Sequence, residues 1–203
     1  MQHKLFDDNA HLLLPKELMA YLPGFLAESE ADALLDFLLN HVPWQQHKAV
    51  LYDKEIITPR LTAWYGDRPI RDGDVRTPVP WIPELWELKG KVERATGSTF
   101  QGVLLNLYRD ENDSVAWHAD KDTVPGHKTE IASLSLGQER DFDFRKKENH
   151  RLRYSIRLQH GSLLLMKGDL QRYWEHRIAK SAIAMKPRIN LTFRKSALLD
   201  RFP

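Results

Sequence analysis

The sequence predicts an α+β domain in which helices pack outside a two-sheet sandwich or jelly roll. Two segments with helical spacing of apolar residues come first, and at least six strand-like segments follow from Phe100 onward. With 203 residues and 42% hydrophobic content, the chain is long enough for one sizeable core and too short for two ordinary domains. We therefore expect a single domain spanning residues 1–203.

Two helices are expected before the strands. The first follows Ser29, a residue type that caps helix N-termini, and ends near Pro43. The second has Pro83 in its first turn and stops at Gly97, where a left-handed residue is tolerated. The expected apolar faces consist of Ala31, Leu34, Leu35 and Leu38 in the first helix and Leu85, Leu88, Val92 and Ala95 in the second. Both helices should cover a sheet.

Short apolar or alternating segments, separated by Gly and Asp, fill the second half of the chain. They are FQGVLLNLY, EIASLSLG, DFDFR, RYSIRL, GSLLLMKG and RINLTFR. Their length and their β-branched or alternating content are typical of strands. The stretches 125–129 and 146–153 are expected to be exposed connections.

Composition narrows the possible functions. The formal charge of +2, from 30 basic and 28 acidic residues, neither requires nor excludes a nucleic-acid partner. The absence of cysteine excludes disulfides, thiolate zinc sites and cysteine nucleophiles, and it fits a reducing compartment. The apolar run Leu12 to Leu14 is far shorter than a signal-peptide core, and no stretch approaches membrane-spanning length. We expect a soluble cytoplasmic protein without a membrane partner.

A metal site is indicated by two residues just after one predicted strand and a third residue in another. His118 and Asp120 are two residues apart, so in extended chain their side chains point to the same side. His176 lies 58 residues after His118 in another expected strand and can supply a third ligand. Two histidines and one carboxylate form the facial triad that binds non-haem Fe(II) and leaves positions for a co-substrate and dioxygen. Zinc hydrolysis is the competing chemistry, and a surface-loop hydrogen bond is the alternative for the His-x-Asp pair alone.

Alternation places the polar residues of PRINLTFR on one strand face. Arg188, Asn190, Thr192 and Arg194 share this face, and buried guanidinium groups need anionic partners. A dicarboxylate such as 2-oxoglutarate offers a carboxylate suited to a bidentate arginine contact, for which Arg188 is our choice. Arg194 would serve the keto-acid end or hold Asp120 in place. The alternative is an edge strand with a charged solvent face.

The strand VLLNLY repeats this pattern. Asn106 and Tyr108 are two polar residues on one face of an otherwise apolar strand that leads into the metal loop. Both are expected to hydrogen-bond the carboxylates of the co-substrate. A tyrosine in a strand is, taken alone, more often a core residue.

Together, NLY, WHADKD, SLGQERDFDFR, WEHRI and PRINLTFR resemble the AlkB family of dealkylating dioxygenases, especially the branch with the animal DNA-repair members. The resemblance covers roughly residues 57 to 195. It implies a double-stranded β-helix, or jelly-roll, core over 100–195, an N-terminal part over 1–56, and a nucleotide-recognition lid over 57–80.

The resemblance also implies a ligand set. Fe(2+) would be held by His118, Asp120 and His176, with 2-oxoglutarate and O2 as co-substrates. The residues expected to surround 2-oxoglutarate are Asn106, Tyr108, Arg188, Asn190 and Arg194.

Substrate contacts are expected from the lid and the metal loop. The segment PRLTAWYGD resembles the lid, and Trp64 or Tyr65 would stack on an extruded base, with core packing as the alternative for Trp64. Arg60 and Arg140 would belong to a phosphate-binding rim. Asp122 matches the family residue that faces the exocyclic amine of the damaged base; its alternative is a solvated loop carboxylate. The stretch RIAKSAIAMK departs from the family's His-x-x-Pro ending, which puts neighbouring DNA contacts in doubt.

By this resemblance, the chain is expected to act as a monomer that demethylates N-alkylated bases such as 1-methyladenine and 3-methylcytosine in DNA or RNA. The reaction would release formaldehyde, succinate and CO2. A 2-oxoglutarate-dependent hydroxylase of a protein or small molecule, and a catalytically silent binding module, remain as alternatives.

Overall fold

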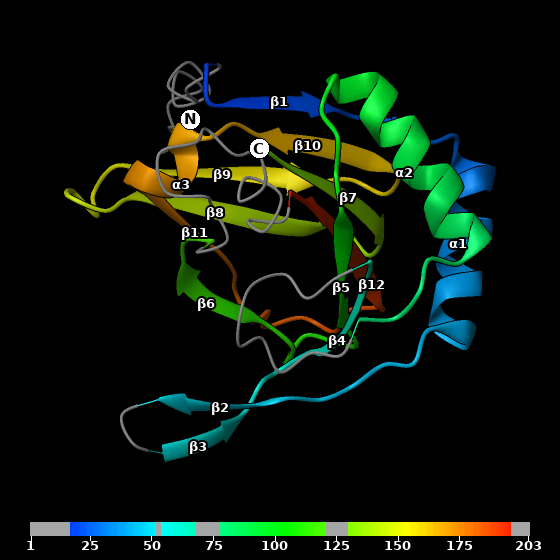
Figure 1. Ribbon diagram of the computed structural model, residues 1–203. Coiled ribbons are helices and arrows are strands. Elements are labelled where there is room, and N and C mark those ends of the chain that lie inside the picture. Colours follow the sequence, from blue (N-terminus) through cyan, green and yellow to red (C-terminus); the bar gives the residue numbers. More distant parts are fainter. Residues whose placement is uncertain (1–16, 52–53, 68–77, 121–129, 196–203) are drawn as a thin grey trace, which may run out of the picture.

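The computed structural model describes residues 17–51, 54–67, 78–120 and 130–195 (Figure 1). Its elements, in chain order, are β1 (Met19–Leu22), α1 (Glu28–His41), β2 (Lys48–Leu51), β3 (Lys54–Ile57), β4 (Leu61–Gly66), α2 (Pro83–Thr96), β5 (Gly102–Tyr108), β6 (Val115–His118), β7 (Ile131–Gly137), β8 (Arg140–Lys146), β9 (Arg153–Leu158), β10 (Ser162–Met166), α3 (Asp169–Tyr173), β11 (Trp174–Ile178) and β12 (Arg188–Arg194).

Two antiparallel sheets form the body of the molecule. The major sheet has six strands in the order β1-β10-β7-β12-β5-β4, and the minor sheet has four in the order β6-β11-β8-β9. Strands β2 and β3 form a separate hairpin that projects away from the sheets (Figure 1). The order of the strands departs from the chain order in both sheets, as a jelly roll requires. The predicted α+β jelly roll is confirmed.

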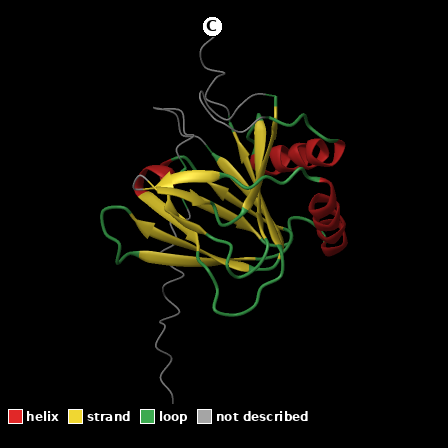
Figure 2. Ribbon diagram, turned by 90° about the horizontal axis from the view of Figure 1, so that it is seen from below, coloured by secondary structure: helices red, strands yellow, loops and turns green. Residues whose placement is uncertain are grey.

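Helices α1 and α2 cover the outer face of the major sheet (Figures 1 and 2). Their buried residues, including Leu38 and Leu88, belong to one apolar cluster with the residues of β5, β7 and β12 that face them. Helix α2 begins at Pro83 and is capped at its C-terminus by Gly97, whose φ of 70° is left-handed, as predicted. The predicted cap at Ser29 is wrong. Helix α1 begins at Glu28, two residues earlier than predicted, with Ala27 as its N-cap and no capping side-chain hydrogen bond, so Ser29 lies inside the first turn.

Alternation in the central strands separates an apolar face from a polar one. In β12, Ile189, Leu191 and Phe193 are buried in the cluster under the helices. The residues between them face the space between the two sheets, where they line a cavity together with alternate residues of β5. Because this strand is hydrogen-bonded to both β5 and β7, its polar face lies at the centre of the major sheet.

A second apolar cluster fills the remaining space between the sheets. It includes Phe142 and Phe144 of β8, Leu164 of β10, and Trp174 of β11. The minor sheet therefore packs against the major sheet through aromatic and aliphatic side chains, while the polar face of β12 lies beside this cluster.

The six strand segments read from the second half of the sequence are all strands in the structure. Strands β1 to β4 were not predicted. Strand β4, from Leu61 to Gly66, pairs with β5 at the edge of the major sheet, so this part of the expected lid is a sheet strand. Among the described residues, no helix is long and apolar enough to cross a membrane.

Candidate active site

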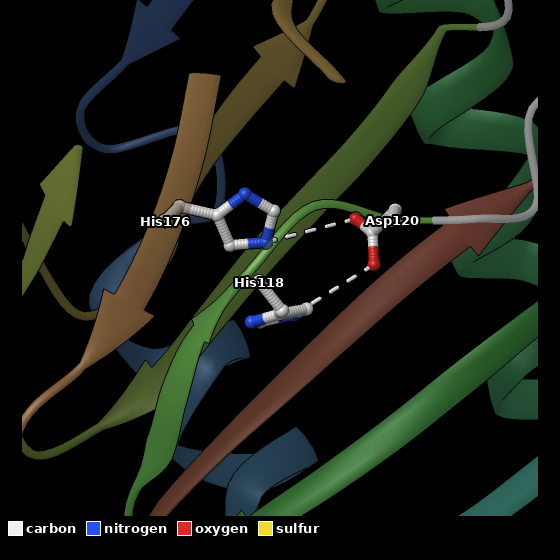
Figure 3. A group of neighbouring side chains, drawn as sticks. All are labelled: His118, Asp120 and His176. Carbon is white, nitrogen blue, oxygen red and sulfur yellow. Dashed lines mark ion pairs between the residues drawn. The ribbon is translucent and has the colours of Figure 1, made fainter. Parts of the chain in front are cut away.

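Three side chains converge between the two sheets (Figure 3). His118 ends β6, Asp120 follows two residues later, and His176 lies in β11 directly opposite His118 in the antiparallel register. Nε2 of His118 lies 3.9 Å from Oδ1 of Asp120, and Nε2 of His176 lies 3.8 Å from Oδ2. One ligand atom from each residue lies within 4.8 Å of the other two. The spacing of the three residues therefore brings two imidazoles and one carboxylate around a single point.

The carboxylate of Asp120 is buried and ionised. Burial would raise its pKa, but the charge of the Arg194 guanidinium, followed by the charges of His176 and His118, lowers the pKa of Asp120 to about 2. Arg194, at the end of β12, donates from Nη2 to Oδ1 of Asp120 across 2.9 Å. Of the two roles expected for Arg194, the structure shows the contact with Asp120.

Both imidazoles are placed to present a nitrogen to Asp120. Nδ1 of His118 lies 2.9 Å from the carbonyl of Ala116, which favours a proton on Nδ1 and leaves Nε2 as the acceptor. His176 is 4% exposed, and burial lowers its pKa to about 3, so its ring is neutral at pH 7. The ring of Phe142 packs 5.0 Å from that of His176. Neutral imidazole is the form that coordinates a metal ion.

A cavity of about 400 Å³ opens beside these three residues. The polar wall comes from the major sheet, and most of the apolar lining comes from the minor sheet. The residues of the polar wall are Asn106, Tyr108, Ser133, Arg188, Asn190, Thr192 and Arg194. The apolar residues are Val115, Phe142, Leu158 and Ile178 of the minor sheet and Leu104 and Met166 of the major sheet.

Arg188 is a buried cation on the polar wall. Its side chain is 1% exposed, and burial lowers its pKa to about 10, so it stays charged at pH 7. Nη2 donates to Oγ of Ser135 across 2.9 Å, whereas Nε and Nη1 have no hydrogen-bond partner among the described residues. Buried donors without acceptors are costly, and the cost is larger for a charged group. The cavity therefore has the chemistry to receive an anion at Arg188.

The other predicted co-substrate residues line the same cavity. Oδ1 of Asn106 accepts a bond from Nε of Arg60 across 3.0 Å. Nδ2 of Asn190 donates to Oγ of Ser133 across 2.7 Å, and its Oδ1 accepts from Thr192. Asn190 is thus bonded mainly within the sheet.

The predicted substrate residues are placed on different sides of the structure. Tyr65 is 1% exposed and belongs to the core under the helices, away from the cavity. Trp64 is 3% exposed and packs with Leu104, a cavity residue. Arg60 lines the cavity. Asp122 lies outside the described residues.

Arg140 holds loops together. It is 3% exposed, and its guanidinium donates to the carbonyls of Asp110, Asp113 and Ala179 at 3.2, 3.2 and 2.6 Å. This placement favours a structural role over the expected contact with phosphate.

Sequence reasoning missed three polar residues near the site. Ser133 and Ser135 alternate with leucine in IASLSLG, and the same period-two argument used for β12 would have found them. Gln171, in the single-turn helix α3, accepts a bond from the backbone N–H of Asp120. No pattern in the sequence signals that contact.

The comparison with known families gives one match over most of the chain. The model of the 2OG-Fe(II) oxygenase superfamily matches residues 18–194. This range includes the three converging residues and both walls of the cavity.

Two curated mammalian proteins and one solved structure are similar to the chain. Mouse alpha-ketoglutarate-dependent dioxygenase alkB homolog 3 is 44% identical over 85% of the chain, which spans 64% of that protein. Mouse DNA oxidative demethylase ALKBH2 is 36% identical over 83% of the chain and 76% of its own length. The solved structure of OsALKBH1, at 18% identity and a TM-score of 0.65, covers 87% of the chain and 97% of its own, and it shows a shared fold.

Proposed function

This chain belongs to the 2OG-Fe(II) oxygenase superfamily and to the AlkB homologues within it, and on that premise we propose that it demethylates N-alkylated nucleic-acid bases by oxidation. The observation that carries the proposal is the convergence of His118, Asp120 and His176 beside a cavity whose opposite wall holds the partly unsatisfied Arg188. The chain spans less than two thirds of the alkB homolog 3 protein, so activity and substrate are proposed for this chain and not transferred from that protein.

The three converging residues fit a ferrous ion. Two neutral imidazole nitrogens and one carboxylate are the donor set of non-haem Fe(II) sites that keep open coordination positions. The pKa of about 3 for His176 and of about 2 for Asp120 make both groups ready to coordinate at pH 7 without losing a proton. We assign Fe(II) to His118, Asp120 and His176. Zinc hydrolysis uses similar ligands, but membership of the oxygenase superfamily favours iron.

The polar wall fits 2-oxoglutarate. A dicarboxylate entering the cavity would give Nε and Nη1 of Arg188 the anionic acceptor that the described residues do not provide. Tyr108, whose ring lies 5.3 Å from the Arg188 guanidinium carbon, and Asn106 border the same space. We assign Arg188 to the distal carboxylate, with Asn106, Tyr108, Asn190 and Arg194 around the molecule. Arg194 acts through Asp120, to which it is hydrogen-bonded.

The protein's own contribution is binding and orientation. When bound, iron, 2-oxoglutarate and O2 would supply the oxidation of an N-alkyl carbon, yielding succinate, CO2, formaldehyde and the repaired base. Arg194 keeps Asp120 ionised and oriented, and the Ala116 carbonyl orients His118. The apolar residues, including Phe142 and Ile178, line the space beside the triad. These residues need not act as nucleophiles or transfer protons.

We propose nucleic acid, either DNA or RNA, as the substrate class. The name of the mouse relative, DNA oxidative demethylase, supports this choice over a protein or small-molecule hydroxylase. Trp64 packs against a cavity residue, which supports it over Tyr65 as the aromatic residue near the extruded base. Arg60 borders the cavity, and Asp122 is retained as the proposed contact with an exocyclic amine.

The remaining expectations stand as parts of the proposal. A single domain over residues 1–203 and a monomeric state are predictions for solution measurement. The cysteine-free composition supports the cytoplasmic location.

Formaldehyde release tests the proposed function. Purified protein is incubated with Fe(II), 2-oxoglutarate and oligonucleotides containing 1-methyladenine or 3-methylcytosine, and matched unmethylated oligonucleotides serve as controls. We expect formaldehyde and succinate in equal amounts from the methylated strands. If the protein forms succinate from 2-oxoglutarate but releases no formaldehyde with either methylated oligonucleotide, a different substrate would be favoured.

A further inference from the structure

Gln171 connects helix α3 with the metal loop. Its side chain is 4% exposed, and its Oε1 accepts a hydrogen bond from the backbone N–H of Asp120 across 2.9 Å. The two residues are 51 positions apart in the sequence. Helix α3 leads directly into β11, so the segment that carries Gln171 also carries His176 five residues later.

The N–H of Asp120 needs this acceptor. Strand β6 ends at His118, so Asp120 lies beyond the paired residues of the minor sheet. Its carboxylate is bonded to Arg194, but that contact involves only the side chain and not the backbone of Asp120. The bond to Gln171 fixes the backbone, and Asp120 is thereby held at two points from two different elements.

Gln171 is itself held firmly. Nζ of Lys147 donates to its backbone carbonyl across 2.8 Å, and the backbone N–H of Lys147 donates to the carbonyl of Tyr173 across 2.9 Å. Leu170 is buried in the cluster between the sheets. Helix α3 is therefore anchored on both sides of the glutamine, so its side chain starts from a fixed backbone.

The amide of Gln171 has one favourable orientation. With Oε1 on the N–H of Asp120, Nε2 lies 3.6 Å from Sδ of Met166, a weak acceptor. The reversed amide would place an NH2 group against the N–H of Asp120 and leave both donors unsatisfied in a buried site. The Asp120 N–H and Sδ of Met166 therefore favour the orientation in which Oε1 of Gln171 faces Asp120.

We propose that Gln171 is a positioning residue of the metal site, which fixes the backbone of Asp120 relative to His176 so that the three ligands are arranged before the ion binds. This inference rests on the proposed function, because it takes the three residues as Fe(II) ligands. Gln171 is not one of the three proposed ligands, but its replacement is expected to change the affinity for the metal ion. Residues that orient metal ligands typically change metal affinity by ten- to a hundredfold when they are replaced.

Two substitutions separate the acceptor from the bulk of the side chain. Gln171→Met keeps a similar length and volume but removes the acceptor oxygen. Gln171→Glu keeps an oxygen in reach of the Asp120 N–H. Gln138→Met is the matched control, because Oε1 of Gln138 also accepts from a backbone N–H, that of Lys186 across 3.3 Å, in a turn outside the cavity lining.

The readout is the dissociation constant for Fe(II) alone, measured by anaerobic calorimetry, with the thermal unfolding of each metal-free variant recorded in parallel. We expect Gln171→Met to fold and to bind Fe(II) roughly ten- to a hundredfold more weakly than wild type. Gln171→Glu should stay within about fivefold of wild type, a smaller loss than the ten- to hundredfold expected for Gln171→Met, and Gln138→Met should match wild type.

Three results would overturn the inference. The first is wild-type affinity for Fe(II) in a folded Gln171→Met variant. The second is an equal loss of Fe(II) affinity in Gln171→Met and Gln171→Glu. The third is a Gln171→Met variant that is unfolded without metal, which would make Gln171 a purely structural residue. Failure of the wild-type protein to bind Fe(II) would overturn the proposed function as well. Wild-type binding together with any of the three results would overturn the role of Gln171 alone.

Discussion

Arg194 and Asp120 form a buried ion pair, with Nη2 of the guanidinium 2.9 Å from Oδ1 of the carboxylate and both side chains less than a tenth exposed. The pair joins β12, the last described strand along the chain, to the residues that follow β6, and Asp120 and Arg194 are 74 residues apart in sequence. The two arginines of the polar face of β12 therefore differ in their surroundings. Arg194 is bonded to Asp120, a proposed metal ligand, whereas Nε and Nη1 of Arg188 face the cavity without a hydrogen-bond partner among the described residues.

Arg194→Met should weaken metal binding. Asp120 would lose the charge that lowers its pKa and the donor that orients it, and a carboxylate buried without its partner is strongly unfavourable. We expect Fe(II) to bind about ten- to a hundredfold more weakly, as for other residues that orient metal ligands. Anaerobic calorimetry with Fe(II) measures this, and an unchanged dissociation constant would show that the pair does not support the metal site.

Arg188→Lys should affect the co-substrate and spare the metal. An ammonium group cannot reproduce the planar contact of a guanidinium, so binding of 2-oxoglutarate should lose about 1.5–3 kcal/mol. The apparent requirement for 2-oxoglutarate should rise by roughly tenfold or more. Binding of Fe(II) alone serves as the control and should match wild type. A 2-oxoglutarate saturation curve identical to that of wild type would place the distal carboxylate elsewhere.

Replacing any one of His118, Asp120 and His176 by Ala should abolish tight Fe(II) binding. Each variant leaves two ligands where the geometry provides three, and Asp120→Ala also leaves Arg194 without its carboxylate. Metal titration of each variant is the measurement, with thermal unfolding of the metal-free protein as the check on folding. Wild-type affinity in a folded single variant would remove that residue from the ligand set.

Trp64→Ala and Tyr65→Ala both remove a buried aromatic ring, and only Trp64→Ala should also weaken substrate binding. Tyr65 is buried under the helices, so Tyr65→Ala should lower the free energy of unfolding by about 3–5 kcal/mol, as for other large aromatic truncations. Trp64→Ala should weaken binding of a methylated oligonucleotide by roughly tenfold or more, since a base–aromatic stack contributes ~1–3 kcal/mol. Fluorescence anisotropy of labelled oligonucleotide and denaturant unfolding give the two quantities. Equal oligonucleotide affinity in wild type and a folded Trp64→Ala variant would exclude Trp64 as the stacking residue.

Arg140→Met should destabilise the fold without a direct effect on oligonucleotide affinity. Its guanidinium satisfies three backbone carbonyls of two loops, and their loss should cost on the order of 3 kcal/mol of unfolding free energy. Urea unfolding measures the cost. A variant with wild-type stability and weakened oligonucleotide binding would instead place Arg140 at the phosphate rim, as the sequence suggested.

Much of the fold and the three converging residues were predictable, because alternation and helical spacing are local properties of the sequence. The period-two pattern of β12 predicted which residues face the cavity, and Arg188 and Arg194 both lie there. The spacing of His118 and Asp120 predicted a shared side, and the register of β6 with β11 brings His176 opposite His118. The register itself was not readable from the sequence.

Other features depend on contacts between distant segments. Arg140 was predicted to belong to a phosphate-binding rim, but it is buried and bonds three backbone carbonyls from distant segments. Gln171 has no motif around it, and its partner is 51 residues away. Tyr65 and Trp64 are neighbours that the sequence could not distinguish, and the pairing of β4 with β5 turns them to opposite faces of the sheet. Asp122 lies outside the described residues.

We propose that the triad and Arg188 together serve oxidative demethylation of nucleic acid. Mass spectrometry of an oligonucleotide that carries a single 1-methyladenine, after incubation with the protein, Fe(II), 2-oxoglutarate and O2, measures this reaction. We expect complete loss of the methyl group with wild type, and an unchanged mass with Asp120→Ala or without 2-oxoglutarate. Retention of the methyl group by wild-type protein that binds both Fe(II) and 2-oxoglutarate would exclude this demethylation and favour a different substrate for the same site.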